Sequence, residues 1–414
     1  MSDVVTVSDE ATLCEAVAAA LSGGQTLEVV GHGSKRGIGR AIQTDLTLDV
    51  SRLSGVSLYE PDELVLSARA GTPMAEIEAL LVQQNQMLAF EPMDLGPLLG
   101  RAPGLGSIGG VFSCNLAGPR RISAGAVRDH ALGARAVSGR GEVFKSGGRV
   151  VKNVTGYDLP RLLAGAFGTL AVLSEVTLKV LPRPATEETL ILLCQPAPAL
   201  PRGDTSDLPR LEALAMSAAM GSSCEVSAAA ALPAGLAGGL PSLPADRAVV
   251  AFRLEGFEPS VRARRAMLIS VLAPFGGVEV LEDAASKGFW AGVRDVVPFA
   301  GTGDRAVWRI STPPIAGPFL ADHLTRTLGA EAFCDWAGGL VWVLMPGEAA
   351  EAEAVRAALA PHGGHATLIR GTASARAGAV FQPLEPALDA LTRRVKASFD
   401  PNGLLNPGRM HAGM

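Results

Sequence analysis

The chain has 414 residues, 48% of them hydrophobic and 19% charged, and its formal net charge is −5. This length predicts two or three domains, and the composition supports a large packed core instead of a disordered chain. The absence of a basic excess argues against binding to nucleic acid. No run of about 20 uninterrupted apolar residues is present, so we expect no direct membrane span. The N-terminal residues also lack the basic and apolar regions of a secretory signal.

Short helices and strands are expected at the start of the chain. Apolar residues recur with helical spacing after Ser8 until two glycines at 23–24, which predicts a first helix capped by Ser8. Thr72 followed by Pro73 predicts the start of a second helix, with Thr72 as its cap. Alternating apolar and polar residues predict strands at 27–30, 46–50, 56–59 and 64–68, and the last two form a hairpin around Pro61-Asp62.

Residues 100–130 differ from their surroundings, because glycine and other small residues dominate and the apolar residues follow neither a helix nor a strand period. We expect an irregular segment here, and long irregular segments inside compact domains tend to be functional. Pro182-Arg-Pro184 later marks a domain boundary. Between these points the patterns predict strands at 132–138, 142–145 and 172–181 and a helix at 160–166.

The C-terminal half predicts a sheet covered on one face by helices, because strand and helix patterns alternate along it. Residues 195–245 are rich in alanine, proline and glycine and give only weak signals. The predicted strands cover residues 248–254, 278–281, 306–311, 340–344 and 366–369, and the predicted helices cover 260–272, 319–328, 349–359 and 384–397.

The cysteines are too far apart in sequence to form a clustered site. An odd number of cysteines at such spacing fits reduced thiols in a cytosolic protein. It also argues against an iron–sulfur cluster of the usual closely spaced kind on this chain. The five residues are Cys14, Cys114, Cys194, Cys224 and Cys334.

The first glycine-rich segment runs from Gly31 to Gly39 and follows a predicted strand. Successive backbone N–H groups in such a turn converge on a phosphate, and Lys35 and Arg36 add positive charge. The spacing also resembles a nicotinamide-binding loop, but that site needs a helix directly after the loop, and a strand pattern follows here. A short-chain dehydrogenase would also need a Tyr-x-x-x-Lys pair, which neither tyrosine provides. A plain glycine turn is the alternative that stays open.

The second segment covers residues 104–118 and is crowded with glycine, which lets the backbone approach a flat ligand closely. Arg120, Arg121 and Arg128 follow it and could neutralise a diphosphate. The alternative is a flexible surface loop, although exposed loops usually carry more polar residues than this one.

The third segment covers residues 147–158. Lys152, Asn153 and Thr155 could supply hydrogen-bond donors beside a ligand. The alternative is an ordinary strand–turn–helix connection in which Asp158 is only a helix cap.

Three such segments in this order within residues 1–182 make the chain resemble the PCMH-type FAD proteins, also called the vanillyl-alcohol oxidase type. Within that superfamily, Val151-Lys-Asn-Val-Thr-Gly-Tyr-Asp-Leu159, Leu-Ala-Gly-Pro-Arg-Arg121 and Ser123-Ala-Gly-Ala-Val-Arg-Asp129 are similar to the FAD-binding subunits of bacterial glycolate oxidases. The closing Phe399-Asp-Pro-Asn-Gly-Leu-Leu-Asn-Pro-Gly408 resembles the tail of the same superfamily. Over residues 195–380 the resemblance rests on length and on the order of elements.

The resemblance implies an α+β fold in which residues 1–182 form a PCMH-type FAD-binding domain of two α/β subdomains. An α+β, ferredoxin-like cap or substrate domain would follow in residues 183–383, and the C-terminal helix and tail, 384–414, would return to the FAD domain. The cofactor would be FAD without a covalent bond. His32 lies in the loop where a covalent link would form, so attachment there is the alternative.

The same resemblance implies which residues bind the cofactor. The loop from Gly31 to Arg36 would cradle the pyrophosphate, Val172 would pack near the adenine and Asn406 would lie near the flavin. The complete expected set is Gly31, His32, Gly33, Ser34, Lys35, Arg36, Gly106, Ser107, Ile108, Gly109, Gly110, Asn115, Gly118, Arg120, Val127, Lys152, Asn153, Thr155, Gly168, Val172 and Asn406.

The chain departs from the catalytic 2-hydroxy-acid dehydrogenases of this superfamily, because the His-containing Gly-Asp-Gly-Asn motif of their cap is missing. His362 and His365 lie close together, but without a third ligand nearby we expect a turn and no metal site. Oxidation of a hydroxy acid needs a cation for the carboxylate and a base for the hydroxyl. Arg294 is a candidate cation, with a structural arginine as the alternative, and no residue stands out as the base.

We therefore expect an FAD-binding subunit of a glycolate oxidase, which supports oxidation of glycolate to glyoxylate beside a catalytic flavin subunit and an iron–sulfur subunit. The expected substrate is a small hydroxy acid. The expected location is cytoplasmic, with peripheral attachment to the inner membrane through partners as an alternative. Two other hypotheses stay open: a self-sufficient FAD-dependent dehydrogenase of a hydroxy acid or alcohol, and a scaffold subunit without redox chemistry.

Overall fold

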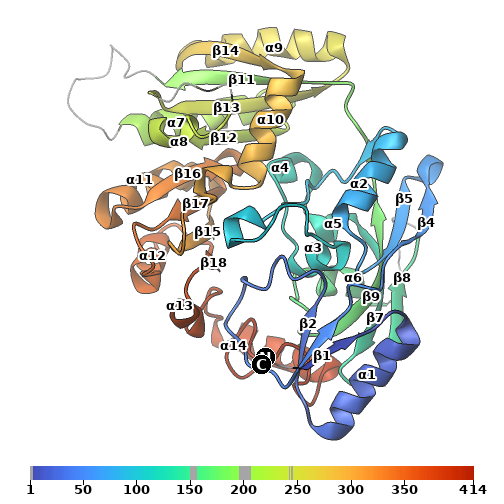
Figure 1. Ribbon diagram of the computed structural model, residues 1–414. Coiled ribbons are helices and arrows are strands. Elements are labelled where there is room, and N and C mark those ends of the chain that lie inside the picture. Colours follow the sequence, from blue (N-terminus) through green and yellow to red (C-terminus); the bar gives the residue numbers. More distant parts are fainter. Residues whose placement is uncertain (1–2, 150–155, 195–206, 242, 244–245) are drawn as a thin grey trace. The chain divides into compact units, whose positions relative to one another are not determined.

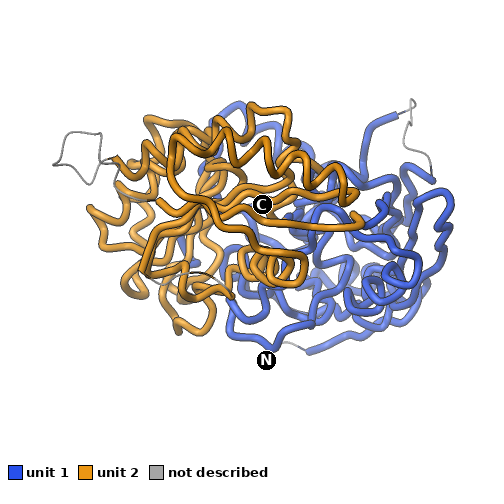
Figure 2. Tube along the Cα trace, turned by 90° about the horizontal axis from the view of Figure 1, so that it is seen from above, with its two compact units in different colours: residues 1–117, 125–183, 376–414 blue, residues 118–124, 184–375 orange. Residues whose placement is uncertain are grey.

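The computed structural model describes residues 3–149, 156–194, 207–241, 243 and 246–414. Two compact units divide the chain, and Figure 2 shows them in different colours. Unit 1 comprises residues 1–117, 125–183 and 376–414, and unit 2 comprises residues 118–124 and 184–375. The predicted limits of the FAD-binding domain, at 182, and of the cap domain, at 383, stay predictions.

A small parallel sheet begins unit 1. Its strands lie in the order β1-β3-β2, and helix α1 (Glu10–Gly23) connects β1 to β2. The predicted helix is confirmed, but its cap is Asp9 and not Ser8, because the side chain of Asp9 accepts from the backbone N–H of Thr12 at 2.8 Å. The strands are β1 (Asp3–Thr6), β2 (Leu27–Val30) and β3 (Leu46–Asp49).

An antiparallel sheet of five strands forms the second layer of unit 1, in the order β4-β5-β9-β7-β8. The predicted hairpin is confirmed as β4 and β5, joined by the short 3-10 helix η1 (Pro61–Glu63). A separate pair is formed by β6 (Gln86–Met87) and β10 (Leu181–Pro182). The five strands are β4 (Val56–Glu60), β5 (Val65–Arg69), β7 (Ala131–Ser138), β8 (Val143–Gly147) and β9 (Ala171–Lys179).

Helix α3 (Ile108–Cys114) lies inside the segment that we expected to be irregular, so that expectation is wrong. The hydroxyl of Ser107 caps the helix by accepting from the N–H of Gly110 at 3.4 Å, and Asn115 ends it in the left-handed region at φ 48°. These two caps compensate for the glycines, whose helix propensity is low. Unit 1 also contains η2 (Pro97–Leu99), α5 (Val127–His130) and α6 (Leu159–Leu163).

Helix α2 (Met74–Gln83) begins one residue later than the sequence predicts. Pro73 occupies the cap position in extended backbone. The hydroxyl of Thr72 instead donates to the carbonyl oxygen of Arg69 at 2.7 Å, so Thr72 fixes the turn after β5.

The C-terminal segment packs against the parallel sheet of unit 1. The N–H of Leu27 donates to the carbonyl oxygen of Leu404 at 2.8 Å, and the N–H of Asn406 donates to the carbonyl oxygen of Leu27 at 2.9 Å. The tail thereby extends the hydrogen bonding of β2. Two helices precede the tail, α13 (Ala373–Ala377) and α14 (Pro386–Phe399).

Unit 2 is built on an antiparallel sheet of eight strands in the order β14-β11-β13-β12-β16-β17-β15-β18. Figure 1 shows β14, β11, β13 and β12 side by side beneath helix α9. The strands are β11 (Thr186–Cys194), β12 (Ala228–Leu232), β13 (Val249–Gly256), β14 (Gly276–Glu282), β15 (Val307–Ser311), β16 (Glu331–Asp335), β17 (Leu340–Leu344) and β18 (His365–Arg370).

The sheet consists of two ferredoxin-like halves. Each half follows the chain order strand, helix, strand, strand, helix, strand, and in each the first strand lies between the third and the fourth. The halves join where β12 pairs with β16. The predicted α+β, ferredoxin-like architecture is therefore confirmed, in two copies. The helices within the halves are α7 (Asp207–Met220), α9 (Glu258–Leu272), α11 (Gly317–Leu328) and α12 (Ala352–Leu359).

Several elements of unit 2 escaped the sequence analysis. Strand β12 reads Ala-Ala-Ala-Ala-Leu, which favours a helix, yet it lies fully buried between β13 and β16. Tertiary pairing overrides the local preference here. Among the described residues, no helix combines the length and apolar composition needed to cross a membrane. The remaining elements of this unit are α4 (Arg121–Ala124), α8 (Ala234–Ala237), α10 (Asp283–Arg294), η3 (Val297–Phe299), η4 (Pro314–Ala316) and η5 (Trp336–Gly338).

Candidate cofactor site

A pocket in unit 1 lies between the end of β2, the loop that follows it, helix α3 and the C-terminal tail. It brings together residues from all three parts of this unit's sequence. We call it the unit 1 pocket. Its lining consists of Val29, Val30, Gly31, His32, Gly33, Ser34, Lys35, Arg36, Val50, Ala70, Ser107, Gly109, Gly110, Ser113, Cys114, Phe167, Gly168, Ala171, Leu173, Asn406 and Arg409.

Lys35 supplies a positive charge to the unit 1 pocket. Its Nζ lies 3.4 Å from the hydroxyl of Ser34, and no carboxylate among the described residues forms an ion pair with it. Desolvation is the main cause that lowers the pKa of Lys35, against the smaller opposing charges of Cys114 and Asp94. An ammonium group that loses hydration without a close acidic partner fits a site for an anionic ligand.

Two glycines allow backbone segments to approach each other at this pocket. A Cβ atom on Gly31 would lie 2.7 Å from the hydroxyl of Ser107, and a Cβ atom on Gly109 would lie 2.7 Å from the carbonyl oxygen of Ala70. A side chain at Gly31 would force the loop away from the start of helix α3, and one at Gly109 would force α3 away from the residue that follows β5. His32 lies beside them, with its Nε2 atom 2.9 Å from the carbonyl oxygen of Gly71.

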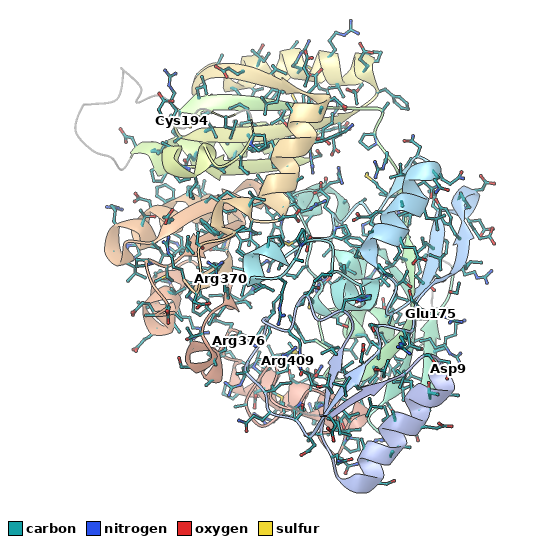
Figure 3. All side chains as sticks on the ribbon, in the orientation of Figure 1. Asp9, Glu175, Cys194, Arg370, Arg376 and Arg409 are labelled. Atoms are coloured by element: carbon teal, nitrogen blue, oxygen red, sulfur yellow. The ribbon has the colours of Figure 1, made fainter. Side chains whose placement is uncertain are left out.

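Arg36 lines the pocket but is paired with Glu28. Its Nε donates to Glu28 at 3.0 Å, and this carboxylate raises the pKa of Arg36. The C-terminal segment supplies two more arginines, labelled in Figure 3: Arg376, whose Nε donates to the carbonyl oxygen of Gly39 at 2.8 Å, and Arg409, which lines the pocket. Desolvation lowers the pKa of Arg409. The loop is thus held by Arg376. Lys35 and Arg409 both contribute charge to the pocket, and the Nη2 atom of Arg409 also lies 3.8 Å from the carboxylate of Glu28.

Asn406 connects three segments at the pocket. Its Oδ1 accepts from the N–H of Val29 at 2.9 Å, and its Nδ2 donates to the carbonyl oxygen of Phe167 at 2.8 Å. A Cβ atom on Gly168, at φ 67°, would lie 2.8 Å from that Nδ2 atom. The tail therefore fixes the end of β2 against the turn before β9.

The structure places part of the expected cofactor-binding set elsewhere. Val172 is fully buried in the core beside the parallel sheet, and Ile108 and Val127 are buried in the other core of unit 1. The side chain of Asn115 accepts from the N–H of Arg128 at 3.0 Å, which ties α3 to α5. Gly106 packs near Met74 and Lys35 beside the pocket.

Gly118 and Arg120 belong to unit 2. Arg120 donates two hydrogen bonds to Glu255, at 3.1 and 2.6 Å, so its charge is balanced within that unit. Three further expected residues, Lys152, Asn153 and Thr155, lie outside the described part of the chain.

Sequence reasoning missed the contributions of Cys114, Phe167 and Arg409 to this pocket. A signal existed for Arg409, since it follows Asn406 within the tail segment. Cys114 and Phe167 gave no comparable signal, because their position depends on how α3 and β9 pack.

The candidate substrate cation Arg294 has a different partner. Its Nε and Nη2 donate to Asp295 at 2.9 and 2.7 Å, so a structural role fits better, as the stated alternative has it. Within the described residues, no three His, Cys, Asp or Glu side chains gather closely enough to hold a metal ion.

Comparison with known proteins gives the family. Residues 2–147 match the family model described as FAD binding domain. The chain is 36% identical over 401 residues to glycolate oxidase subunit GlcE of Escherichia coli strain K12, covering 97% of both chains. The chain belongs to the GlcE family. It is accordingly an FAD-dependent oxidoreductase, as the sequence predicted.

Two further similarities place this GlcE family member among other flavoproteins. Glycolate oxidase subunit GlcD of Bacillus subtilis strain 168 is 32% identical over 136 residues, which is 33% of this chain and 28% of that protein. The solved structure of p-cresol methylhydroxylase with substrate bound superposes with a TM-score of 0.69 at 14% identity, covering 99% of this chain and 88% of that chain. The second similarity confirms the predicted PCMH-type fold.

The residues of the unit 1 pocket fit the FAD of the GlcE family. Gly31 and Gly109 line the pocket with backbone that carries no side chain, and Lys35 offers an ammonium group without a close acidic partner to a diphosphate. Arg409 offers a second cation from the tail. Ala171 and Leu173 add apolar contacts suited to a fused ring.

Proposed function

We propose that this chain is the FAD-binding subunit of a glycolate oxidase complex, in which glycolate is oxidised to glyoxylate. The observation that carries the proposal is the 36% identity to GlcE, which extends over 97% of both chains. An identity of this extent covers residues of both units.

The reaction removes two electrons and two protons from the CH–OH group of glycolate and leaves the aldehyde of glyoxylate. FAD supplies the two-electron chemistry when it is bound. The residues of this chain would hold the cofactor: Lys35 and Arg409 would balance the diphosphate, and the backbone at Gly31 and Gly109 would lie beside it.

The proposed partners are a catalytic flavin subunit of the GlcD type and an iron–sulfur subunit that receives the electrons. The similarity to GlcD over 136 residues supports descent of the two flavin subunits from one ancestor. We propose a cytoplasmic location, with attachment to the inner membrane only through the partners.

The proposal is tested with Lys35→Met in the complete complex, with Lys287→Met as a matched control. Lys287 lies on α10 and pairs with Asp283 at 2.7 Å on the surface, so its loss removes a lysine charge away from the pocket. We expect Lys35→Met to lose flavin from this subunit and to slow glycolate oxidation at least tenfold. The control keeps its flavin spectrum and its rate.

Two results would contradict the proposal. Full complex activity after loss of this subunit's flavin would favour the scaffold hypothesis. Rapid oxidation of glycolate by the isolated chain with a dye acceptor would favour a self-sufficient dehydrogenase.

A further inference from the structure

A pocket in unit 2 lies on the side of the sheet that helices α7 and α11 cover. We call it the unit 2 pocket. Residues of α7, α8, α11, β12 and β16 line it, and its volume is about 350 Å³. Pockets of roughly 300–1,000 Å³ accommodate small organic molecules. The lining consists of Leu208, Pro209, Glu212, Ala231, Pro233, Gly235, Leu236, Pro318, Ala321, Asp322, Thr325, Ala330, Glu331, Ala332, Phe333 and Cys334.

The charged groups of the unit 2 pocket are all acidic. Glu212, Asp322 and Glu331 line it, and the described lining residues include no lysine, arginine or histidine. Asp322 pairs with Arg326, and Glu331 pairs with Arg305 at 2.7 Å, both on the outer side of the unit. Glu212 is the acidic group that remains without a cation. A lining of this kind repels anions and favours a positively charged ligand.

Glu212 is buried without a bonding partner. Its exposed fraction is 9%, and the described residues form neither a hydrogen bond nor an ion pair with its carboxyl group. It follows Leu208 and Pro209 by one helical turn, so the three residues share the face of α7 that lines the pocket. Buried carboxyl groups in proteins normally have partners, because desolvation is costly without one. A ligand in the pocket would supply the missing partner.

The groups around Glu212 hold a proton on it at neutral pH. Burial, and then the charge of Asp322 on α11, raises the pKa of Glu212 to about 8. The thiols of Cys194 on β11 and Cys334 on β16 also face Glu212, and burial raises the pKa of each thiol. None of these groups is a cation. A bound cation would therefore stabilise the ionised carboxylate and release its proton to the solvent.

We propose that the unit 2 pocket binds a small primary alkylamine, with its ammonium group paired to the carboxylate of Glu212. An ammonium group donates three hydrogen bonds, and the paired charges make those to a carboxylate strong. The side chains of Leu208, Leu236 and Pro318 offer apolar contacts to the alkyl chain. The inference goes beyond the proposed function, because this site uses neither the flavin nor its pocket.

The test measures binding by isothermal titration calorimetry, with the complete chain and its FAD bound. The probes are hexylamine, 1-hexanol and hexanoate, which share an alkyl chain and differ in charge. We expect saturable binding of hexylamine, binding of 1-hexanol that is weaker by roughly tenfold or more, and no binding of hexanoate. Absent binding of hexylamine, or equal affinities for hexylamine and 1-hexanol, would overturn the proposal.

The affinity for hexylamine should depend on pH. An ammonium group of the lysine type keeps its proton up to about pH 10, whereas Glu212 must lose its proton when the amine binds. We expect the affinity to rise by up to about tenfold per pH unit between pH 6 and pH 8 and to level off above pH 8. An affinity that stays constant between pH 6 and pH 8 would overturn the proposal.

Glu212→Gln keeps the shape of the side chain and removes its charge. We expect this variant to bind hexylamine more weakly by roughly tenfold or more, to lose the pH dependence and to bind 1-hexanol as before. The matched control is Glu258→Gln, which breaks an exposed pair with Arg262 on α9 and should change none of these affinities. Unchanged affinity for hexylamine in Glu212→Gln would overturn the proposal.

The flavin separates this test from that of the proposed function. The flavin spectrum should be the same in Glu212→Gln as in the natural chain, since Glu212 lies in unit 2 and the proposed flavin site lies in unit 1. Failure of hexylamine to bind would therefore leave the flavin assignment intact. Loss of flavin in Lys35→Met tests that assignment by itself.

Discussion

Gly109 and Gly288 both lie inside helices, yet their surroundings differ. A Cβ atom on Gly109 would meet the backbone of Ala70 at 2.7 Å, whereas nothing lies within 4 Å of one on Gly288. Their substitution by alanine therefore separates close packing at the unit 1 pocket from helix propensity alone.

We expect Gly109→Ala to lower the free energy of unfolding by about 1–3 kcal/mol, because α3 must move away from β5. Gly288→Ala should raise it by about 0.5–1 kcal/mol, because alanine favours a helix. Urea denaturation of both variants measures the difference. Equal effects in the two variants would show that the contact with Ala70 carries no cost.

Glu212 on α7 is buried beside Asp322, in a mainly apolar pocket of unit 2. Desolvation, then the charge of Asp322, raises the pKa of Glu212 to about 8. The folded state therefore binds a proton that the unfolded state releases near its ordinary pKa of 4.5. The free energy of unfolding should fall as the pH rises from 4.5 to 8 and then level off.

Glu212→Gln removes this titration. Relative to the natural chain, the variant should gain about 2–5 kcal/mol of stability between pH 5 and pH 8. Denaturant unfolding at several pH values measures the gain. A stability difference that does not change with pH would mean that Glu212 is charged in the folded protein.

At the scale of elements, the C-terminal tail depends on one buried ion pair. Lys396 Nζ lies 2.6 Å from Asp400 and donates to the carbonyl oxygens of Thr169 and Leu405 at 2.6 and 3.0 Å. Asp400 also accepts from the N–H groups of Leu404 and Leu405, at 2.9 and 2.8 Å. This network fixes the residues just before Asn406 within unit 1.

Asp400→Asn should cost about 3–5 kcal/mol, because it leaves the buried ammonium of Lys396 without its counter-charge. Weaker flavin retention should accompany the loss, since Asn406 and Arg409 follow directly in the tail. Thermal unfolding and the flavin spectrum measure both effects. The matched control, Asp389→Asn, breaks the exposed pair with Arg393 on the same helix and should change neither quantity.

At the scale of the whole molecule, two probes report on different units. The four tryptophans lie in unit 2, and the proposed flavin site lies in unit 1. We expect flavin release and tryptophan fluorescence to give different unfolding midpoints. FAD at 100 times its dissociation constant should stabilise unit 1 by about 2.7 kcal/mol and move mainly the flavin midpoint. Coincident midpoints at every FAD concentration would show that the units unfold together.

Local patterns predicted many of the elements with regular periods, including the β4–β5 hairpin and helices α9, α11 and α12. They failed at α3 and β12, for opposite reasons. Two capping residues and packing against Ala70 make a helix from a glycine-rich stretch, while burial in the centre of a sheet makes a strand from alanines. Neither cause is visible within a short window of sequence.

The sequence by itself determined the cofactor class and the family, because close backbone approach to a dinucleotide requires glycine at particular positions, and glycine leaves a visible pattern. Only the tertiary structure decided which charges are available. Arg36 pairs with Glu28, Arg120 pairs with Glu255, and Arg309 lies over Trp336. An arginine side chain is long enough to reach several elements, so its partner depends on residues far away in the chain, and spacing along the sequence does not identify it.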